Sequence, residues 1–301
     1  MHHPYLYSLL SSVEAVYFKK FCLSEFHDRF ARVSVSRESP VVAIGAHAVH
    51  LPMGLALAEI RAEGEAQLLA LWVQPKHRRQ GIGTEMLRRL EDELRARNVW
   101  RLSVFYEKGQ PYTEPVEAFL NACDFPPAET VAVSCRCLSD RMRHAPWIKK
   151  RDVPRAFAIF PWKDMTPEDR CSILARQAST SWFPKELDPF TTDSFEPLNS
   201  LGLRYRGEVV GWQINHRAAP DVIQYSITFV REDLQPFGLG VLLMTEATRL
   251  HFSDPAERDT KAFFRVPLKM QGMTAYIDNR LKPYVDDIRD CMQIRKDLTL
   301  T

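Results

Sequence analysis

Gly81 and Gly83 stand close together in a basic stretch of a chain that has only 12 glycines. Because glycine has no Cβ, it is used where backbone must come close to another group. Lys76, Arg78 and Arg79 precede the pair. A helix that begins at these glycines would present free N–H groups and the positive end of its dipole. The spacing therefore predicts a phosphate-binding turn at the start of a helix.

This glycine spacing differs from two common nucleotide-binding motifs. It matches neither the G-x-x-x-x-G-K-[ST] pattern of P-loop NTPases nor the G-x-G-x-x-G pattern of dinucleotide-binding folds. A plain tight turn before a helix is the alternative, and the flanking basic residues favour the anion site over it.

The glycine pair occurs twice. A shift of 157 positions along the sequence places Gly81 and Gly83 on Gly238 and Gly240. An apolar strand and an earlier glycine match at the same shift, which predicts a duplicated unit. Other matched pairs are Gly54 with Gly211, Gln67 with Gln224, Trp72 with Phe229 and Val73 with Val230.

The hydrophobic pattern predicts the elements that position the first turn. Charged residues four positions apart, such as Glu85 and Arg89, indicate that the helix exposes one face to solvent and does not bind nucleic acid there. The expected elements are a hairpin of Val41–Val49 and Gly54–Arg61, a buried strand Gln67–Val73, a helix Gly81–Arg97, a strand Leu102–Tyr106, a helix Pro115–Ala122 and a last strand Thr130–Leu138. The second unit repeats this order and ends on a strand Asp287–Leu298.

The length of 301 residues fits two domains. We expect an N-terminal domain at residues 1–138, a basic linker at 139–154 and a C-terminal domain at 155–301. The pattern of strands and helices predicts an α/β (α+β) fold, in which each domain has a mixed, mostly antiparallel sheet flanked by helices.

Composition narrows the class of partner. A net charge of +2 gives no global field for nucleic acid, and 45% hydrophobic residues indicate a globular chain. The six cysteines lack the spacing of a zinc site, so no metal is expected. There is no long apolar run and no basic leader, so we expect no membrane contact and a cytoplasmic location.

The run Leu71–Leu87 resembles the acetyl-CoA-binding element of the GCN5-related N-acetyltransferase (GNAT) family, whose motif is [QR]-x-x-G-x-[GA]. Arg78, Gly81 and Gly83 fill the motif positions. The second unit fills them with Gln235, Gly238 and Gly240. Two such domains in one chain are similar to the mycothiol synthase type.

The resemblance implies two tandem GNAT folds and acetyl-CoA, or another acyl-CoA, as co-substrate. Backbone at the end of the third strand would bind pantetheine, and amides of the turn would bind pyrophosphate. The implied cofactor-binding residues are Leu71, Trp72, Val73, Arg78, Arg79, Gln80, Gly81, Ile82, Gly83 and Thr84.

The catalytic residues are less clearly implied. Gln67 occupies the strand position where the family often has its base, and an amide cannot accept a proton. Glu65 on the same strand and Glu59 on the neighbouring strand are candidates that could act through water. Leu120 stands where the family has a tyrosine that protonates the leaving thiolate. Cys123, Tyr112 and Tyr106 are possible substitutes.

The second unit departs from the motif. Pro236 has no N–H to offer a phosphate, and Glu232 and Asp233 place negative charge beside the turn. We therefore expect a degenerate second domain. His216, which corresponds to Glu59, is a candidate base if that domain is the active one.

The leading hypothesis is an N-acyltransferase that moves an acetyl or other acyl group from CoA to a primary amine of a small molecule or peptide, by direct attack in a ternary complex. A non-catalytic CoA-binding or sensing protein is one alternative. A longer-chain acyltransferase with a peptide or aminoacyl acceptor is another.

Overall fold

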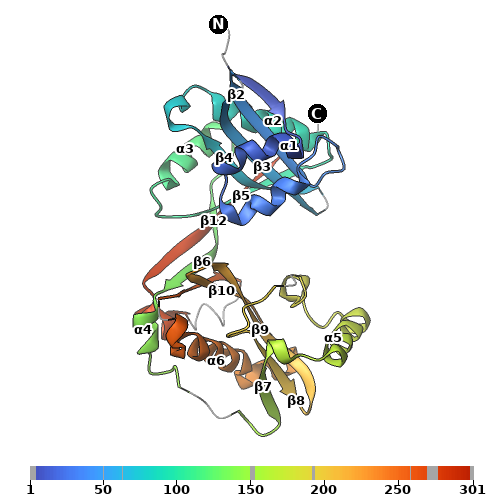
Figure 1. The fold of residues 1–301 in the computed structure, drawn as a ribbon, viewed down its shortest axis with the longest axis vertical. Coiled ribbons are helices and arrows are strands. Elements are labelled where there is room, and N and C mark those ends of the chain that lie inside the picture. The colour runs from blue at the N-terminus through green and yellow to red at the C-terminus, as the bar shows by residue number, and fades with distance from the viewer. Residues whose placement is uncertain are drawn as a thin grey trace. The chain divides into compact units, whose positions relative to one another are not determined.

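The computed structural model describes residues 5–49, 51–62, 64–149, 153–191, 194–257, 259–269 and 277–298. The chain divides into two compact units (Figure 1). Unit 1 contains residues 1–131 and 291–301, and unit 2 contains residues 132–290. This division differs from the predicted boundaries at 138 and 155, because each unit takes in a strand from the other half of the sequence.

Unit 1 has one sheet, in the order β1-β2-β3-β4-β5-β12. Its strands are β1 (Leu6–Leu9), β2 (Val41–Ala48), β3 (Leu51–Ala62), β4 (Glu65–Val73) and β5 (Arg101–Glu107), joined by the Cys291–Asp297 part of β12 (Asp287–Asp297). Its helices are α1 (Ser12–Ala15), α2 (Ile82–Arg95) and α3 (Thr113–Ala122), with short 3-10 helices η1 (Val16–Phe21), η2 (Ser24–Arg32) and η3 (Pro75–His77).

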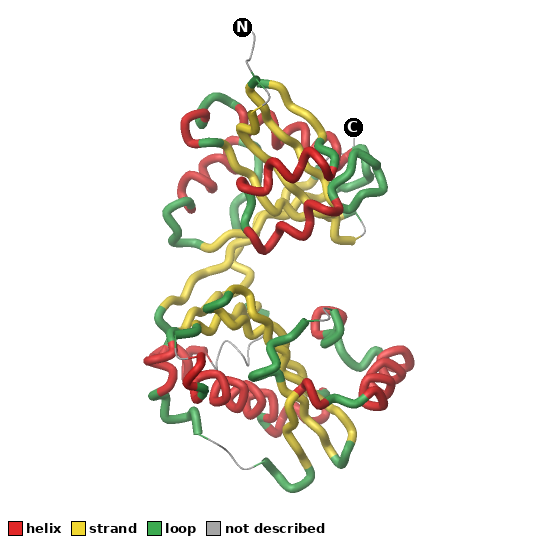
Figure 2. The backbone as a smooth tube through the Cα atoms, viewed as in Figure 1, coloured by secondary structure: helices red, strands yellow, loops and turns green. Residues whose placement is uncertain are grey.

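Successive side chains of these strands point to opposite faces of the sheet, and apolar side chains occur on both faces. Helices cover each face and bury them (Figure 2). Ala56 and Ala58 of β3 pack with α2 and α3 on one face. Leu55 and Leu57 pack with η1 and η2 on the other face.

Unit 2 has the sheet order β6-β11-β10-β9-β8-β7. Its strands are β6 (Glu129–Cys137), β7 (Phe157–Pro161), β8 (Leu201–Tyr205), β9 (Glu208–Ala219), β10 (Val222–Val230) and β11 (Lys261–Pro267). Its helices are α4 (Ser139–Arg143), α5 (Pro167–Thr180) and α6 (Leu239–Ser253). Short helical turns are η4 (Trp162–Asp164), η5 (Lys185–Leu187), η6 (Glu232–Phe237), η7 (Pro255–Glu257), η8 (Ile277–Leu281) and η9 (Lys282–Tyr284).

Each sheet is mixed and mostly antiparallel, as predicted. Among the strand pairs of the described residues, β4 with β5 in unit 1 and β10 with β11 in unit 2 are parallel, and the other pairs within each unit are antiparallel. The predicted strands and helices of the first unit are present within a few residues of their expected limits. The sequence also predicts a helix Gln271–Arg280 in the second unit, and most of it lies outside the described residues. The strand β1 and the short helices before residue 41 carry no clear period and were not predicted.

The last strands of the two halves are exchanged. The sequence predicts that Thr130–Leu138 closes the first domain and that Asp287–Leu298 closes the second. Instead, β6 pairs with β11 from Ala132 to Cys137, and β12 pairs with β5 from Cys291 to Asp297. Alternating apolar residues predict a strand, but they carry no information about which sheet it joins.

The segment 139–154, predicted as a basic linker, is partly folded into unit 2. Residues 139–143 form α4, and the side chains of Met142, Ala145 and Trp147 are buried in the core of unit 2. These apolar residues stand between arginines, and burying them fixes this segment on unit 2. Residues 150–152 lie outside the described part of the chain.

Candidate functional site

β4 and β5 separate halfway along their length. They pair from Glu65 to Leu68 on β4, although β4 continues to Val73. A β-bulge at Leu69 interrupts the register of β4 with β3, and a bulge bends its strand. The edge of β4 that faces β5 therefore has main-chain groups free of strand pairing at Leu71 and Val73. The main chain of Trp72 faces β3 instead, because Trp72 and Leu55 share the register in which the N–H of Gln74 donates to the carbonyl of Met53. Of the three cofactor-binding residues predicted on β4, Leu71 and Val73 therefore lie on the open edge.

β4 leads through η3 into the glycine turn. Arg79 has φ +62° and Gly81 has φ +79°, and Gly81 is the N-cap of α2. The N–H of Glu85 donates to the carbonyl of Gly81 over 3.0 Å as the first bond of the helix. The amides of Ile82, Gly83 and Thr84 thus precede any intrahelical bond.

The two glycines have different roles. A Cβ placed on Gly81 would have no heavy atom within 4 Å, so this side of the turn is open. A Cβ on Gly83 would lie 3.3 Å from Cε2 of Phe119 and 3.7 Å from Cγ2 of Val73. Gly83 therefore lets the first turn of α2 pack closely on α3 and β4, while Gly81 leaves room for a ligand at the helix N-terminus.

The turn is held in place by residues far away in the sequence. Tyr5 is buried, and its hydroxyl donates to Oε1 of Gln80 over 2.7 Å and lies 2.9 Å from Nδ1 of His77. Sequence reasoning missed Tyr5, because no local pattern connects it to a loop some seventy positions later. Arg78 donates from Nε to the carbonyl of Val73 over 2.9 Å, which ties the motif residue to the end of β4.

Trp72 lies between a ring and a cation on the face of the sheet that η1 covers. The Phe21 ring stacks on it with centroids 4.5 Å apart, and the guanidinium of Arg78 lies 5.7 Å from its centroid. Both contacts fix the side chain of Trp72 on this face of the sheet.

Unit 2 repeats the main-chain geometry of this site. Gln235 donates from Nε2 to the carbonyl of Val230 over 3.0 Å, as Arg78 does to Val73. Gly238 has φ +68° and is the N-cap of α6. β10 pairs with β11 only to Tyr225 and has a bulge directly after it. The predicted duplication is thus present at the level of single hydrogen bonds.

Side chains make the second turn different. Pro236 lies inside η6, and Phe237 has 71% of its surface exposed. Arg231 donates from Nε to Asp233 over 2.6 Å, so the nearest cation is held by a carboxylate of its own loop. Fewer amides and less free positive charge are left for an anion than at Gly81.

The two candidate carboxylates of unit 1 lie in different surroundings. Glu59 is buried, and guanidinium groups of Arg29, Arg32 and Arg61 lie within 3.2 Å of its oxygens. Glu65 has a side chain that is 47% exposed and contacts one cation, Arg101, at 3.2 Å.

The candidate proton donors lie around α3. Tyr106 donates to Oε1 of Glu117 over 2.8 Å, and burial together with this carboxylate raises the pKa of its phenol. Burial also raises the pKa of the Cys123 thiol. Leu120 is buried in the core, and Tyr112 is half exposed just before α3. Tyr106 and Cys123 therefore both keep their protons at neutral pH.

His216 lies on β9 of unit 2. Its Nδ1 is 2.8 Å from Oγ of Ser226, the bulge residue of β10. Burial lowers the pKa of the imidazole, so His216 is neutral at neutral pH and could accept a proton.

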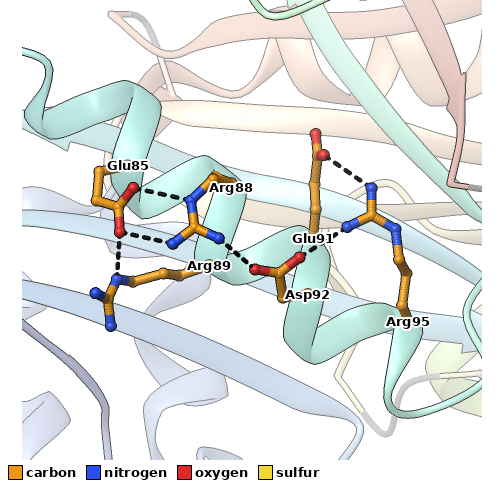
Figure 3. Close-up of polar contacts among 6 residues, drawn as sticks. All are labelled: Glu85, Arg88, Arg89, Glu91, Asp92 and Arg95. Carbon is orange, nitrogen blue, oxygen red and sulfur yellow. Dashed lines mark hydrogen bonds and ion pairs between the residues drawn. The ribbon is translucent and has the colours of Figure 1, made fainter. Parts of the chain in front are cut away.

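The charged face of α2 is a ladder of ion pairs (Figure 3). The predicted pair of Glu85 with Arg89 is confirmed at 2.7 Å, as are Glu91 with Arg95 at 3.4 Å and Glu93 with Arg97 at 3.7 Å. Arg88 bonds Glu85 as well, and this hydrogen bond lowers the pKa of the Glu85 carboxyl to about 2. A hollow of about 250 Å³ beside this ladder is lined by β1, Ile44 and α2, and no residue of β4 or β5 borders it.

In the part of the chain that the structure describes, no helix is long and apolar enough to cross a bilayer. Among the same residues, no group of three metal-ligating side chains is gathered in one place.

The sequence and the fold were compared with known families and solved structures. Residues 6–125 match the sequence model of the acetyltransferase (GNAT) family. A tandem GNAT protein from the clavulanic acid biosynthesis pathway, solved without acetyl-CoA, is 14% identical, with 99% of both chains covered and a TM-score of 0.69. A GCN5-related N-acetyltransferase from Sphaerobacter thermophilus is 12% identical over 99% of this chain and 97% of that chain, with a TM-score of 0.64.

A probable N-acyltransferase from Enterococcus faecalis is 10% identical, covering 98% of this chain and 73% of that chain, with a TM-score of 0.58. No curated protein matches the sequence significantly. The chain has the fold of a tandem GNAT protein, and its first part is similar in sequence to the acetyltransferase (GNAT) family. These likenesses do not single out the mycothiol synthase type.

Proposed function

We propose that the protein is an N-acyltransferase whose first unit binds an acyl-CoA and transfers the acyl group to a primary amine. The observation that carries this proposal is the open edge of β4 beyond Leu68, which leads directly to the α2 N-terminus at Gly81. An extended chain of amides ending in a pyrophosphate matches such a path, because the strand edge offers hydrogen bonds and the helix start offers an anion site.

The residues present fit acyl-CoA at each of these points. Main-chain groups of Leu71 and Val73 would bind the pantetheine amides, while Trp72 between them pairs with β3. Amides from Arg79 to Thr84 would bind the pyrophosphate, where Gly81 leaves open space. That range includes Gln80, Ile82 and Gly83. Arg78 precedes it, and Lys76 adds positive charge nearby in the sequence.

Acyl-CoA would supply a thioester, whose carbonyl the amine attacks directly, without an acyl-enzyme. The chain's own groups must then orient the amine, accept its proton and protonate the leaving thiolate. We assign the first proton transfer to Glu65 through a water, because its carboxylate is half exposed and contacts a single arginine. Glu59 is the weaker candidate, since both of its oxygens face guanidinium groups.

Tyr106 is our candidate for the second proton transfer. It lies on β5 beyond the last residue paired with β4, and its phenol carries a proton at neutral pH. Cys123 is less suited, because it lies at the end of α3 and packs against the core.

We propose that unit 2 binds acyl-CoA weakly or not at all. Pro236 has no N–H to donate to a phosphate, and the charge of Arg231 is already paired with Asp233. His216 would become the base only if unit 2 proved to be the transferase.

A CoA-binding protein without catalysis is the second candidate function. Gln67 favours it, because this side chain accepts a hydrogen bond from Arg61 and has no acid–base chemistry. Incubation of the protein with acetyl-CoA, a panel of primary amines and a thiol reagent separates the two functions. The transferase releases CoA only when an amine is present, and mass spectrometry finds the acylated amine. Release at the background rate with every amine would favour the binding protein.

A further inference from the structure

Three arginines gather around one buried carboxylate in unit 1. Oε1 of Glu59 lies 3.2 Å from Nε of Arg29 and 3.1 Å from Nη1 of Arg32, and Oε2 lies 3.1 Å from Nη1 of Arg61. We call these three residues the arginine cluster. Asp28 contacts Arg29 as well. Three guanidinium groups thus face two carboxylates, Glu59 and Asp28, so the arginine cluster keeps a net positive charge.

Arg32 and Arg61 keep donors available to a ligand. Their side chains are 50% and 48% exposed, whereas that of Arg29 is 26% exposed. A guanidinium has five N–H groups. Arg32 uses Nη1 on Glu59, and Arg61 uses Nη1 on Glu59 and Nη2 on Gln67. The remaining donors form the type of fork that binds a carboxylate in bidentate geometry.

The arginine cluster lies beside the place where β4 leaves β5. Glu59 is the cross-strand partner of Gln67, and Gln67 precedes the bulge at Leu69 by two residues, or roughly 7 Å along a strand. Glu59 shares a face of β3 with Leu57, the face that η1 and η2 cover. A ligand group bound here therefore lies about two residues, or roughly 7 Å, along β4 from the start of the open strand edge.

The opposite face of this sheet is closed to an acceptor. It is packed against α2 and α3, where Leu120 is buried and the first turn of α2 lies on β4. Because the cofactor path runs along β4 to the start of α2, we expect an amine to approach the thioester from the other face. η1 and η2 cover part of that face, but the side chains of Arg32 and Arg61 remain half exposed there.

We propose that the acceptor amine carries a carboxylate close to its nitrogen, as an amino acid does, and that Arg32 and Arg61 bind this carboxylate. Glu59 acts as a positioning residue, which holds the guanidinium groups beside the strand edge. This inference rests on the proposed acyl transfer. It predicts discrimination by charge: an acid is a better acceptor than its own amide.

Matched acceptors test this. Alanine and alaninamide, and glutamate and its α-amide, are assayed with acetyl-CoA in the parent and in Arg32→Gln and Arg61→Gln. We expect the parent to favour the acids by at least about tenfold in kcat/KM, because one charge-assisted contact is worth about that factor or more. Each variant should raise KM for the acids by about tenfold and leave KM for the amides unchanged. Phosphoethanolamine against ethanolamine shows whether a phosphate serves instead of a carboxylate.

Arg88→Gln is the matched control, because Arg88 is an exposed arginine of the α2 ladder, and it should change neither acceptor. Calorimetry of acid and amide on CoA-loaded protein measures binding apart from turnover. Equal affinity for acid and amide, or equal losses for both in the variants, would overturn the carboxylate proposal. A better phosphate acceptor would overturn it as well. Tight, arginine-dependent binding of the acids without CoA release would support it and overturn the acyl transfer.

Discussion

Glu59 and Glu65 are both glutamates on neighbouring strands, and their surroundings give them different roles. Three guanidinium groups hold Glu59 in a buried position, whereas Glu65 meets one arginine near solvent. Only a carboxylate with an accessible oxygen can receive a proton from an amine through water. We therefore expect the two residues to differ in what their replacement changes.

Glu65→Gln should lower kcat by about 10²–10⁴, the usual scale of general base catalysis, and leave CoA affinity unchanged. Activity should recover partly at high pH, because solvent then deprotonates the amine. Steady-state kinetics across pH and CoA titration measure both effects. Glu129→Gln, on the exposed start of β6, is the control. Full activity in Glu65→Gln would remove this residue from the mechanism.

Glu59→Gln should instead lower the free energy of unfolding of unit 1 by about 3 kcal/mol, because it leaves three partly buried arginines without their shared buried anion. Urea unfolding followed by hydrogen exchange measures this. An unchanged stability together with a large loss of kcat would identify Glu59 as the base.

At the scale of residues, the sequence predicted the glycine turn but not the distant residues that contact the site. Gly81 could be found because glycines are few and a basic stretch precedes it. Tyr5, Arg29 and Arg32 could not be connected to the site, since only the folded sheet brings them to residues several dozen positions away. No spacing rule spans such distances.

At the scale of elements, α2 and α6 begin alike and pack against different surfaces. Where unit 1 has Ala56 and Ala58 facing α2, unit 2 has Gln213 and Asn215, buried and hydrogen-bonded to each other over 2.7 Å. His251 of α6 is fully buried in the same region, and its Nδ1 lies 3.2 Å from the hydroxyl of Tyr225. The periodic pattern predicts both helices, and it does not show that the second one packs on a polar face.

His251 should make unit 2 sensitive to acid. Burial lowers the pKa of its imidazole to about 4, while an unfolded histidine keeps about 6.5. Between these values the unfolded chain takes up the proton first, so stability is lost as the pH falls. The loss from pH 7.5 to pH 5 should be about 2 kcal/mol.

Comparison with His251→Leu isolates this group, because leucine occupies the corresponding position, Leu94, in unit 1. Urea unfolding of unit 2, followed by tryptophan fluorescence, should show that the variant has a smaller dependence on pH. If parent and variant lose equal stability between these pH values, the buried neutral histidine is not the cause.

At the scale of the whole molecule, the exchange of last strands makes each unit depend on the other half of the sequence. Ile294 of β12 is buried in the core of unit 1, and Cys135 of β6 is buried in the core of unit 2. The sequence could not predict this, because both possible pairings bury the same alternating side chains.

Ile294→Asp should therefore weaken unit 1, although the residue comes from the C-terminal end of the chain. Placing a charge in that core should reduce hydrogen-exchange protection in β4 and β5 and leave β9 and β10 protected. Cys135→Asp is the reciprocal variant and should have the opposite effect. Loss of protection in β9 and β10 on Ile294→Asp would contradict the exchange.

Calorimetric titration of acetyl-CoA into Gly81→Asp and Gly238→Asp tests most directly that unit 1 holds the cofactor. Aspartate tolerates a positive φ better than most residues, and neither position has an atom within 4 Å of the new Cβ, so both variants should fold. The added charge repels pyrophosphate at the helix N-terminus. We predict one site per chain in the parent and in Gly238→Asp, and none in Gly81→Asp. Two equal sites in the parent, or unchanged affinity in Gly81→Asp, would contradict the assignment of the cofactor to unit 1.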